Sequence, residues 1–232
     1  MSGALAASAL EWWRDAGVDT IVAETPRNWL AQASEAAPEA EASGAGARRT
    51  DALPGDIASF SAWLLESPDV PLAEPPARRV GPLGDPATDL MVMIAMPASG
   101  DALLAGEPGA MLERMMRAIG RDLGSIYLAP LSVVRAPTGR LRPEEATALA
   151  PIARHHIGLV RPRALLLFGD ECALALTGAP AIRARQRWHD VETPAGPVRA
   201  IATMSPQFLV RQPARRREVW EDLQMLMEGL KA

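Results

Sequence analysis

Two polar side chains follow apolar runs, where an α/β domain usually carries its chemistry. Asp101, in the segment Ser99-Gly-Asp101, is the only acid near the end of the run at 90–94, and Ser205 follows the run at 198–203. A carboxylate can accept a proton, and a hydroxyl can donate one hydrogen bond. We therefore treat Asp101 and Ser205 as candidate catalytic residues, although an exposed turn aspartate is the simpler interpretation of Asp101.

The histidines and the cysteine favour structural roles. His155 and His156 are adjacent in a predicted helix, where their side chains point about 100° apart and cannot meet one ligand. His189 directly follows Trp188. Cys172 is the only cysteine, which excludes an internal disulfide and a four-cysteine cluster site.

Apolar runs and helical periodicities alternate along the body of the chain. The runs suit strands that are buried on both faces of a sheet. The expected strands are 90–94, 125–129, 164–169 and 198–203, and the expected helices are 109–120, 142–160, 170–176 and 216–230. This order predicts a three-layer α/β/α sandwich with a mainly parallel four-stranded central sheet. Ligands of such sheets usually bind at the carboxyl ends of the strands.

The first part of the chain has a different composition. Leu5, Leu10 and Trp13 fall near one face of a helix over residues 5–17. Ala, Glu, Ser, Gly and Pro dominate the following stretch, which cannot bury enough apolar surface to offset its ordering entropy. We expect an N-terminal amphipathic segment over 1–30, a flexible linker over 31–56 and an α/β domain over 57–232.

Charge and hydropathy narrow the possible partners and location. Residues 1–76 hold 12 acidic and 4 basic side chains, whereas residues 77–232 hold 16 and 20. The C-terminal part is therefore the side expected to face a polyanion, with basic runs at 183–187 and 215–217 that also suit a solvated helix face. No apolar run is long enough to span a membrane and no signal-peptide pattern begins the chain, so we expect a cytoplasmic protein without membrane contact.

Several local motifs resemble the uracil-DNA glycosylase superfamily, and its iron-sulfur branch in particular. They occur in the family's order, at 11–19, 24–26, 160–169, 187–189, 193–196 and 200–213. The last segment resembles a DNA-inserting loop that reads His-Pro-x-x-Leu-Leu-Arg, of which Pro206, Leu209 and Arg211 remain. The resemblance implies a uracil-DNA glycosylase-like fold and contact with DNA through Pro206, Leu209, Arg211, Arg215 and Arg216.

The same resemblance implies that the groups for excising uracil are replaced. Ala95 stands where the family has the Glu that positions water, and Leu104 where a Phe stacks on the base. Pro130 replaces an Asn that reads the pyrimidine edge, and Ser205 replaces the His that stabilises the leaving uracil. Losing one such donor costs on the order of 10²- to 10³-fold in rate. We expect Ala95, Leu104, Pro130 and Ser205 to converge in one vestigial pocket.

The family's cysteine ligands also have no counterpart. Val70 and Leu149 align with two of the cluster positions, so we expect no iron-sulfur cluster, no other metal and no cofactor. Apolar side chains at former ligand positions predict a direct contact between Val70 and Leu149.

Two functions fit these residues. The first is a non-catalytic descendant that binds DNA, single-stranded or damaged, or acts as an adapter to a repair or replication protein. The second is an active glycosylase that excises uracil or another damaged base with an altered pocket, using Ser205 or Asp101. An unrelated nucleotide-binding domain is disfavoured because no Gly-rich phosphate loop occurs.

Overall fold

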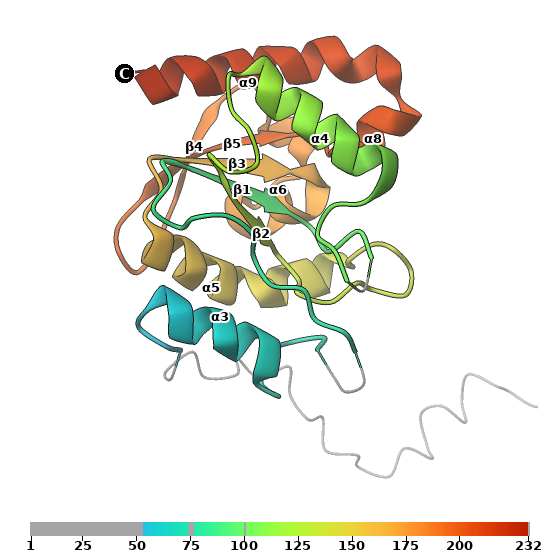
Figure 1. Cartoon of the computed structure of the whole chain (residues 1–232). Coiled ribbons are helices and arrows are strands. Elements are labelled where there is room, and N and C mark those ends of the chain that lie inside the picture. Colours follow the sequence, from blue (N-terminus) through green and yellow to red (C-terminus); the bar gives the residue numbers. More distant parts are fainter. Residues whose placement is uncertain (1–52, 74–76, 100, 232) are drawn as a thin grey trace, which may run out of the picture. The chain divides into compact units, whose positions relative to one another are not determined.

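The computed structural model describes residues 53–73, 77–99 and 101–231 of the chain. The helix expected over 5–17, the motifs between residues 11 and 26, and the linker up to residue 52 lie outside the described residues. The elements, in chain order, are α3 (Ile57–Glu66), β1 (Leu90–Ile94), α4 (Gly106–Ala118), β2 (Tyr127–Pro130), α5 (Pro143–Val160), β3 (Ala164–Phe168), α6 (Gly169–Thr177), α7 (Ala181–Ala184), β4 (Trp188–Val191), β5 (Val198–Thr203), α8 (Pro206–Arg211), η1 (Pro213–Arg215) and α9 (Arg216–Lys231) (Figure 1).

One five-stranded sheet has the order β2-β1-β3-β5-β4. The first four strands in this order are parallel to their neighbours, and β4 is antiparallel to β5. The α/β prediction is confirmed, but the predicted strand number of four was too low because β4 was missed. β4 is an edge strand whose His189 is half-buried and whose Asp190 is exposed, so it lacks the continuous apolar run that marked the other strands.

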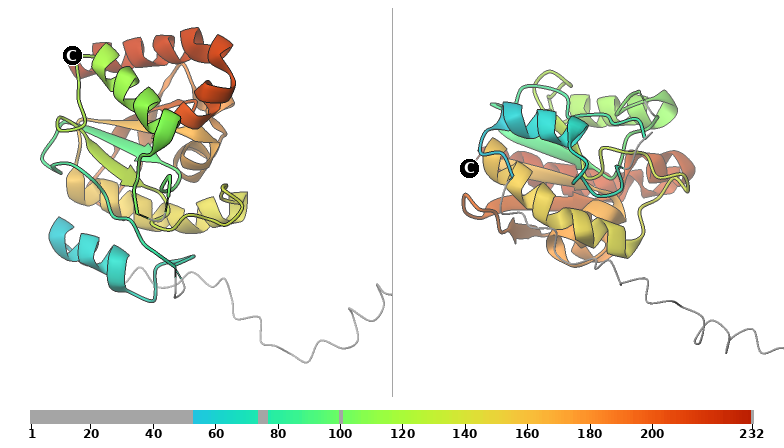
Figure 2. Two further views of the ribbon diagram at one scale, coloured as in Figure 1. Left: turned by 45° about the vertical axis from the view of Figure 1, so that its right-hand side comes forward. Right: turned by 90° about the horizontal axis from the view of Figure 1, so that it is seen from below.

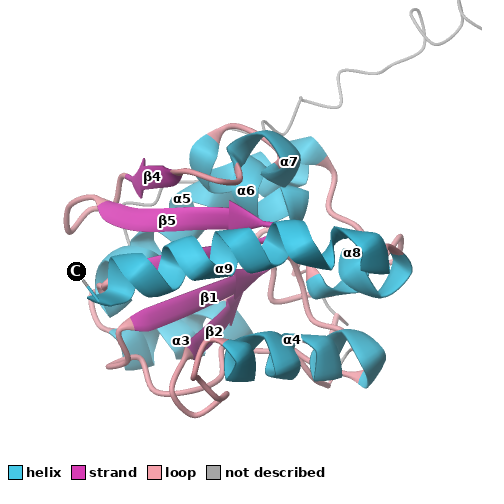
Figure 3. Ribbon diagram, turned by 90° about the horizontal axis from the view of Figure 1, so that it is seen from above, coloured by secondary structure: helices cyan, strands magenta, loops and turns pink. Residues whose placement is uncertain are grey.

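Helices cover both faces of this sheet (Figures 1 and 3). One core cluster joins one face of the sheet to α5 and α6, and the other joins the opposite face to α4 and α9. Every residue of β1 and β3 is buried, which explains their unbroken apolar sequences. Among the described helices, none is both long and apolar enough to cross a bilayer.

The short helix α3 packs on the outer side of α5 (Figure 2). Asp56 begins this helix by accepting a hydrogen bond from the Ser59 backbone N–H at 2.9 Å. Phe60 is fully buried and forms a small core with Val70 and neighbouring apolar residues. This helix was not predicted as a separate element, and it covers part of the face of α5 that points away from the sheet.

The edge strand β4 is held against α9 by a close approach at a glycine. A Cβ atom on Gly229 would overlap the indole ring of Trp188, so the helix comes near this ring only because residue 229 has no side chain. The same Trp188 ring lies 4.1 Å, measured from its centroid, from the guanidinium of Arg199 on β5. Trp188 of β4 therefore contacts both the neighbouring strand β5 and the helix α9.

Candidate functional site

The strands bring four chain segments to one edge of the sheet. Ala95 follows β1, Pro130 ends β2, Gly169 follows β3, and Ser205 lies two residues beyond β5. Because these strands are parallel, all four residues lie toward the carboxyl-end edge. The order of strands gives this edge two halves, which we call the β1/β2 half and the β3/β5 half.

The β1/β2 half carries apolar side chains at the predicted positions. Ile94 is in register with Pro130, and the Ser132 backbone N–H donates to the Ala95 carbonyl at 3.0 Å. Pro130 is buried and Ala95 is half-buried. Leu104 is half-buried near the start of α4 and packs on the α4/α9 core, whereas Ala95 packs on the α5/α6 core. The shared edge is therefore present, while a common pocket for all four residues stays a prediction.

The β3/β5 half carries polar groups. Ser205 is the N-cap of α8, and its hydroxyl accepts a hydrogen bond from the Phe208 backbone N–H at 3.2 Å. A Cβ atom on Gly169 would lie 3.4 Å from the Ser205 Cβ and 3.2 Å from Glu171 Oε2. The Glu171 carboxylate and the Ser205 side chain therefore approach the same point, which glycine leaves open.

Glu171 was missed by the sequence reasoning. It is the third residue of α6, the helix that follows the buried strand β3, and acids are common in a first helical turn because they suit the helix dipole. The available signal was its position three residues after the end of β3, a strand whose carboxyl end had already been assigned to the ligand-binding edge. Only the three-dimensional approach to Ser205 makes it stand out.

Asp101 has the environment of an exposed turn residue. Its carboxylate accepts from Arg78 Nη1 at 2.6 Å, and the two side chains are 75% and 73% exposed. Such an exposed ion pair contributes little to stability. The structure therefore gives Asp101 a solvated partner, and its predicted catalytic role stays a prediction.

The segment predicted as an insertion loop is a short helix, α8. Leu209 is only 1% exposed and packs in the α4/α9 core, and Pro206 is also buried. Insertion of Leu209 into DNA would require this side chain to leave the core, and its predicted contact with DNA stays a prediction. Phe208, its neighbour, is 42% exposed and takes the outward position.

Arginines surround this exposed phenylalanine along the chain. Arg211 ends α8, and Arg215 and Arg216 follow at the junction of η1 and α9; all three are exposed. Arg215 Nη1 donates to Glu218 Oε1 at 2.5 Å, and this hydrogen bond lowers the pKa of Glu218. Arg211, Arg215 and Arg216 thus present positive charge next to an exposed aromatic side chain.

A buried ionic network anchors the start of α9 to β5. Asp222 is fully buried and accepts from Thr203 Oγ1 at 2.6 Å and from Arg185 Nε at 3.1 Å. Arg185 also donates to the Glu218 carboxylate at 2.8 Å and to the Glu218 backbone carbonyl. Burial raises the pKa of Asp222, and the hydrogen bond from Thr203 and the charge of Arg185 oppose this shift.

The histidines have structural partners. His156 Nε2 lies 2.9 Å from the Tyr127 hydroxyl in the core, and burial lowers the pKa of His156 to about 3 and raises that of Tyr127 to about 12. His155 Nε2 lies 2.8 Å from the Pro54 carbonyl, and His189 Nε2 lies 2.6 Å from the Ala184 carbonyl. These contacts agree with the structural interpretation of all three.

Cys172 and the former ligand positions are packed into the interior. Burial raises the pKa of the Cys172 thiol well above its ordinary value. Val70 packs with α3, whereas Leu149 lies in the core between α5 and the sheet, so the predicted Val70–Leu149 contact was wrong. The two residues occupy different sides of α5. Within residues 53–73, 77–99 and 101–231, no group of three His, Cys, Asp or Glu side chains could hold a metal ion.

Comparison with known proteins agrees with the α/β architecture. No curated protein sequence matches the chain significantly. The model of the Uracil DNA glycosylase superfamily matches residues 83–224, which span β1 to most of α9 and exceed half of the chain. The chain therefore belongs to the uracil-DNA glycosylase superfamily.

Proposed function

We propose that this protein binds DNA without excising bases, and that it serves as a binding or adapter protein in DNA repair or replication. One observation carries this proposal: the positions that resemble the family's catalytic Glu, Phe, Asn and His hold Ala95, Leu104, Pro130 and Ser205. Base excision needs groups that position water and stabilise the leaving base. Three of these side chains have no polar atom, and the Ser205 hydroxyl already accepts the N-cap hydrogen bond of α8.

The surface on α8 and at the start of α9 supports DNA binding. Phe208 offers an exposed ring on which an unpaired base can stack, and Arg211 and Arg215 offer charge to phosphates. Leu209 and Pro206 contribute by holding α8 on the core. Single-stranded DNA fits this combination because every base has a face that stacks on an aromatic side chain.

The salt dependence of DNA binding tests this proposal. We expect weak binding to a fluorescein-labelled thymidine oligonucleotide, with the logarithm of affinity falling linearly as the logarithm of salt rises. Replacing Arg211 and Arg215 together by Ala should remove two phosphate contacts and lower this slope by about 1.4. The matched control is Arg163→Ala with Lys231→Ala, which removes the same charge at the amino-end edge of the sheet (Figure 3). Equal slopes in both double variants would overturn the assignment.

One observation favours a second candidate function, an active glycosylase with an altered pocket. The Glu171 carboxylate approaches Ser205 across Gly169, so a carboxylate capable of positioning water lies beside the α8 segment. This reading predicts uracil release from single-stranded DNA in a single-turnover assay. It further predicts that Glu171→Gln abolishes release while DNA binding persists. Glu107→Gln in the first turn of α4 is the control for the loss of an exposed carboxylate.

A further inference from the structure

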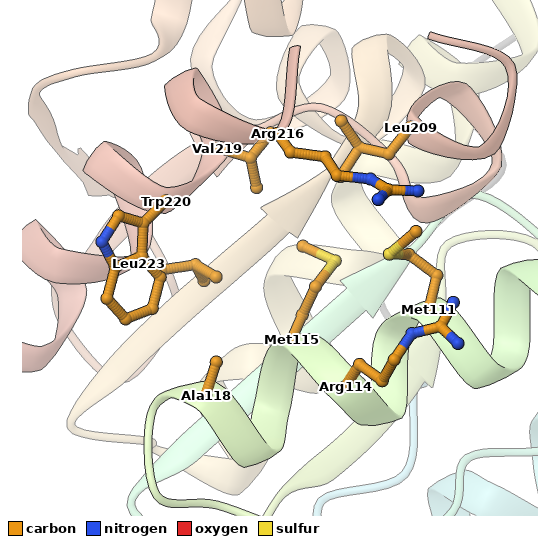
Figure 4. Close-up of a pocket in the computed structure, with 9 residues that line it drawn as sticks. All are labelled: Met111, Arg114, Met115, Ala118, Leu209, Arg216, Val219, Trp220 and Leu223. Carbon is orange, nitrogen blue, oxygen red and sulfur yellow. The ribbon is translucent and has the colours of Figure 1, made fainter. Parts of the chain in front are cut away.

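An open apolar groove lies between α4 and α9, and Leu209 of α8 also lines it. Its volume is about 520 Å³. Met111 and Met115 point from α4 toward α9, and Val219 and Leu223 face them from α9 (Figure 4). Methionine side chains are flexible and polarisable, so they adapt to the shape of an incoming apolar group.

The polar groups of the groove are donors. Arg114 and Arg216 lie at one end and Trp220, which is 38% exposed, lies at the other (Figure 4). Guanidinium groups and an indole N–H donate hydrogen bonds and accept none. Both arginines are exposed, and neither forms an ion pair with another described residue. The groove therefore matches a ligand that combines apolar groups with negative charge.

We propose that this groove binds an acidic amphipathic helix of a partner protein. The elongated apolar floor between two helices suits side chains spaced at i, i+3, i+4 and i+7. Carboxylates beside that stripe would meet Arg114 and Arg216. A nucleobase fits less well because its edge carries acceptors and donors, whereas the groove offers no side-chain acceptor among its lining residues. This site shares Arg216 with the arginines near Phe208, but its apolar lining lies outside the proposed DNA surface of Phe208, Arg211 and Arg215.

Fluorescence anisotropy on the full chain tests this proposal with a defined probe. The probe is a fluorescein-labelled synthetic peptide of about 20 residues, with Leu at helical spacing and Glu at most other positions. A second peptide carries Lys in place of each Glu. We expect the acidic peptide to bind at least roughly tenfold more tightly than the basic one.

Two variants locate the binding on the protein. Ala118 is exposed and lines the groove, so Ala118→Trp fills it from the surface without touching the core. Arg114→Glu reverses the charge at one end, and it leaves the arginines of the proposed DNA surface intact. We expect each variant to weaken acidic-peptide binding roughly tenfold or more. The controls are Ala148→Trp, exposed on α5 at the opposite face of the sheet, and Arg163→Glu at the amino-end edge.

The proposal would be overturned by any of the following results. In the first, the acidic peptide fails to bind, or it binds with equal affinity to the wild type and to Ala118→Trp. A thymidine oligonucleotide displaces the peptide and loses affinity in Ala118→Trp, which would assign the groove to DNA. The chain self-associates in sedimentation and Ala118→Trp disperses it, which would assign the groove to a second copy. Failure of the DNA proposal would instead appear as an unchanged salt slope in the Arg211/Arg215 variant, with peptide binding intact.

Discussion

The two sides of the sheet bury polar groups of different kinds. On the β2 side, the hydroxyl of Tyr127 and the ring of His156 form a neutral pair beneath α3 and α5. On the β5 side, Asp222 and Arg185 form a charged network that continues to Glu218 and Arg215 at the surface. The neutral pair is closed within the core, whereas the charged network reaches the solvent beside η1.

This difference indicates how binding and chemistry can separate in one fold. The β1/β2 half of the carboxyl-end edge ends in Ala95 and Pro130, and the buried Tyr127–His156 pair on that side of the sheet is closed within the core. The β3/β5 half keeps Glu171 and Ser205 at the edge, with exposed arginines on a helix junction that the charged network holds in place. In the proposed function, the anchored arginines beside the β3/β5 half bind DNA, while apolar side chains occupy the β1/β2 half.

Breaking the charged network should have the largest effect on stability. Asp222→Ala leaves Thr203 and the Gln186 backbone N–H without their acceptor and removes one partner of a buried charge, which costs about 3–5 kcal/mol. Urea denaturation measures the loss. The control is Glu228→Ala, an exposed carboxylate on the same helix, which should cost no more than about 0.5 kcal/mol. Similar losses in both variants would contradict the anchoring role of Asp222.

The neutral pair should make the β2 side sensitive to acid. The folded pKa of His156 is about 3 and its ordinary value is 6.5, so the unfolded chain takes up a proton first as pH falls. This contribution to stability is complete above pH 6.5 and is lost as pH falls from 6.5 toward 3, by about 2 kcal/mol between pH 7 and pH 5. His156→Gln should remove this part of the pH dependence in urea denaturation. An unchanged pH dependence in the variant would show that His156 is not its source.

The smallest effect is expected at the exposed face of α8. Phe208→Ala should weaken binding of a thymidine oligonucleotide by about 1 kcal/mol, roughly fivefold, and leave the free energy of unfolding within about 0.5 kcal/mol. The neighbouring Leu209→Ala should instead lower the free energy of unfolding by about 2–5 kcal/mol because Leu209 is 1% exposed in the core. Anisotropy and urea denaturation separate the two roles. Equal DNA affinity in Phe208→Ala and the wild type would remove Phe208 from the DNA surface.

The elements that could be predicted from local sequence are the fully buried strands and the helix with a regular apolar stripe. β1 and β3 are predictable because all their residues are apolar and buried, and α9 because its apolar stripe has helical spacing. β4 could not be predicted in this way because an edge strand needs no continuous apolar run. The six-residue helix α8 could not be predicted either, because such a short helix is stabilised by docking on α4 and by the Ser205 cap rather than by its own sequence.

The candidate site is less predictable because it depends on which side of a short element faces the core. Phe208 and Leu209 are adjacent apolar residues, and only the packing of α8 on α4 decides that Leu209 is buried. The local sequence predicts that Asp222 is a surface acid of a charged helix. In the structure, Thr203 and Arg185, which come from distant segments of the chain, donate hydrogen bonds to it. The parallel strands bring Ala95, Pro130 and Ser205 to the carboxyl-end edge, but the proximity of Glu171 and Ser205 to Gly169 required the three-dimensional structure.

Uracil release by the unmodified protein is the most direct test of the proposal that it binds DNA without excising bases. A single-stranded oligonucleotide with one uracil is mixed with excess protein, and binding and free uracil are measured in the same samples. We predict salt-sensitive binding of the oligonucleotide without release of uracil above the protein-free background. Release above this background would contradict the non-catalytic proposal, and its loss in Glu171→Gln would establish an active glycosylase that uses the β3/β5 half of the edge.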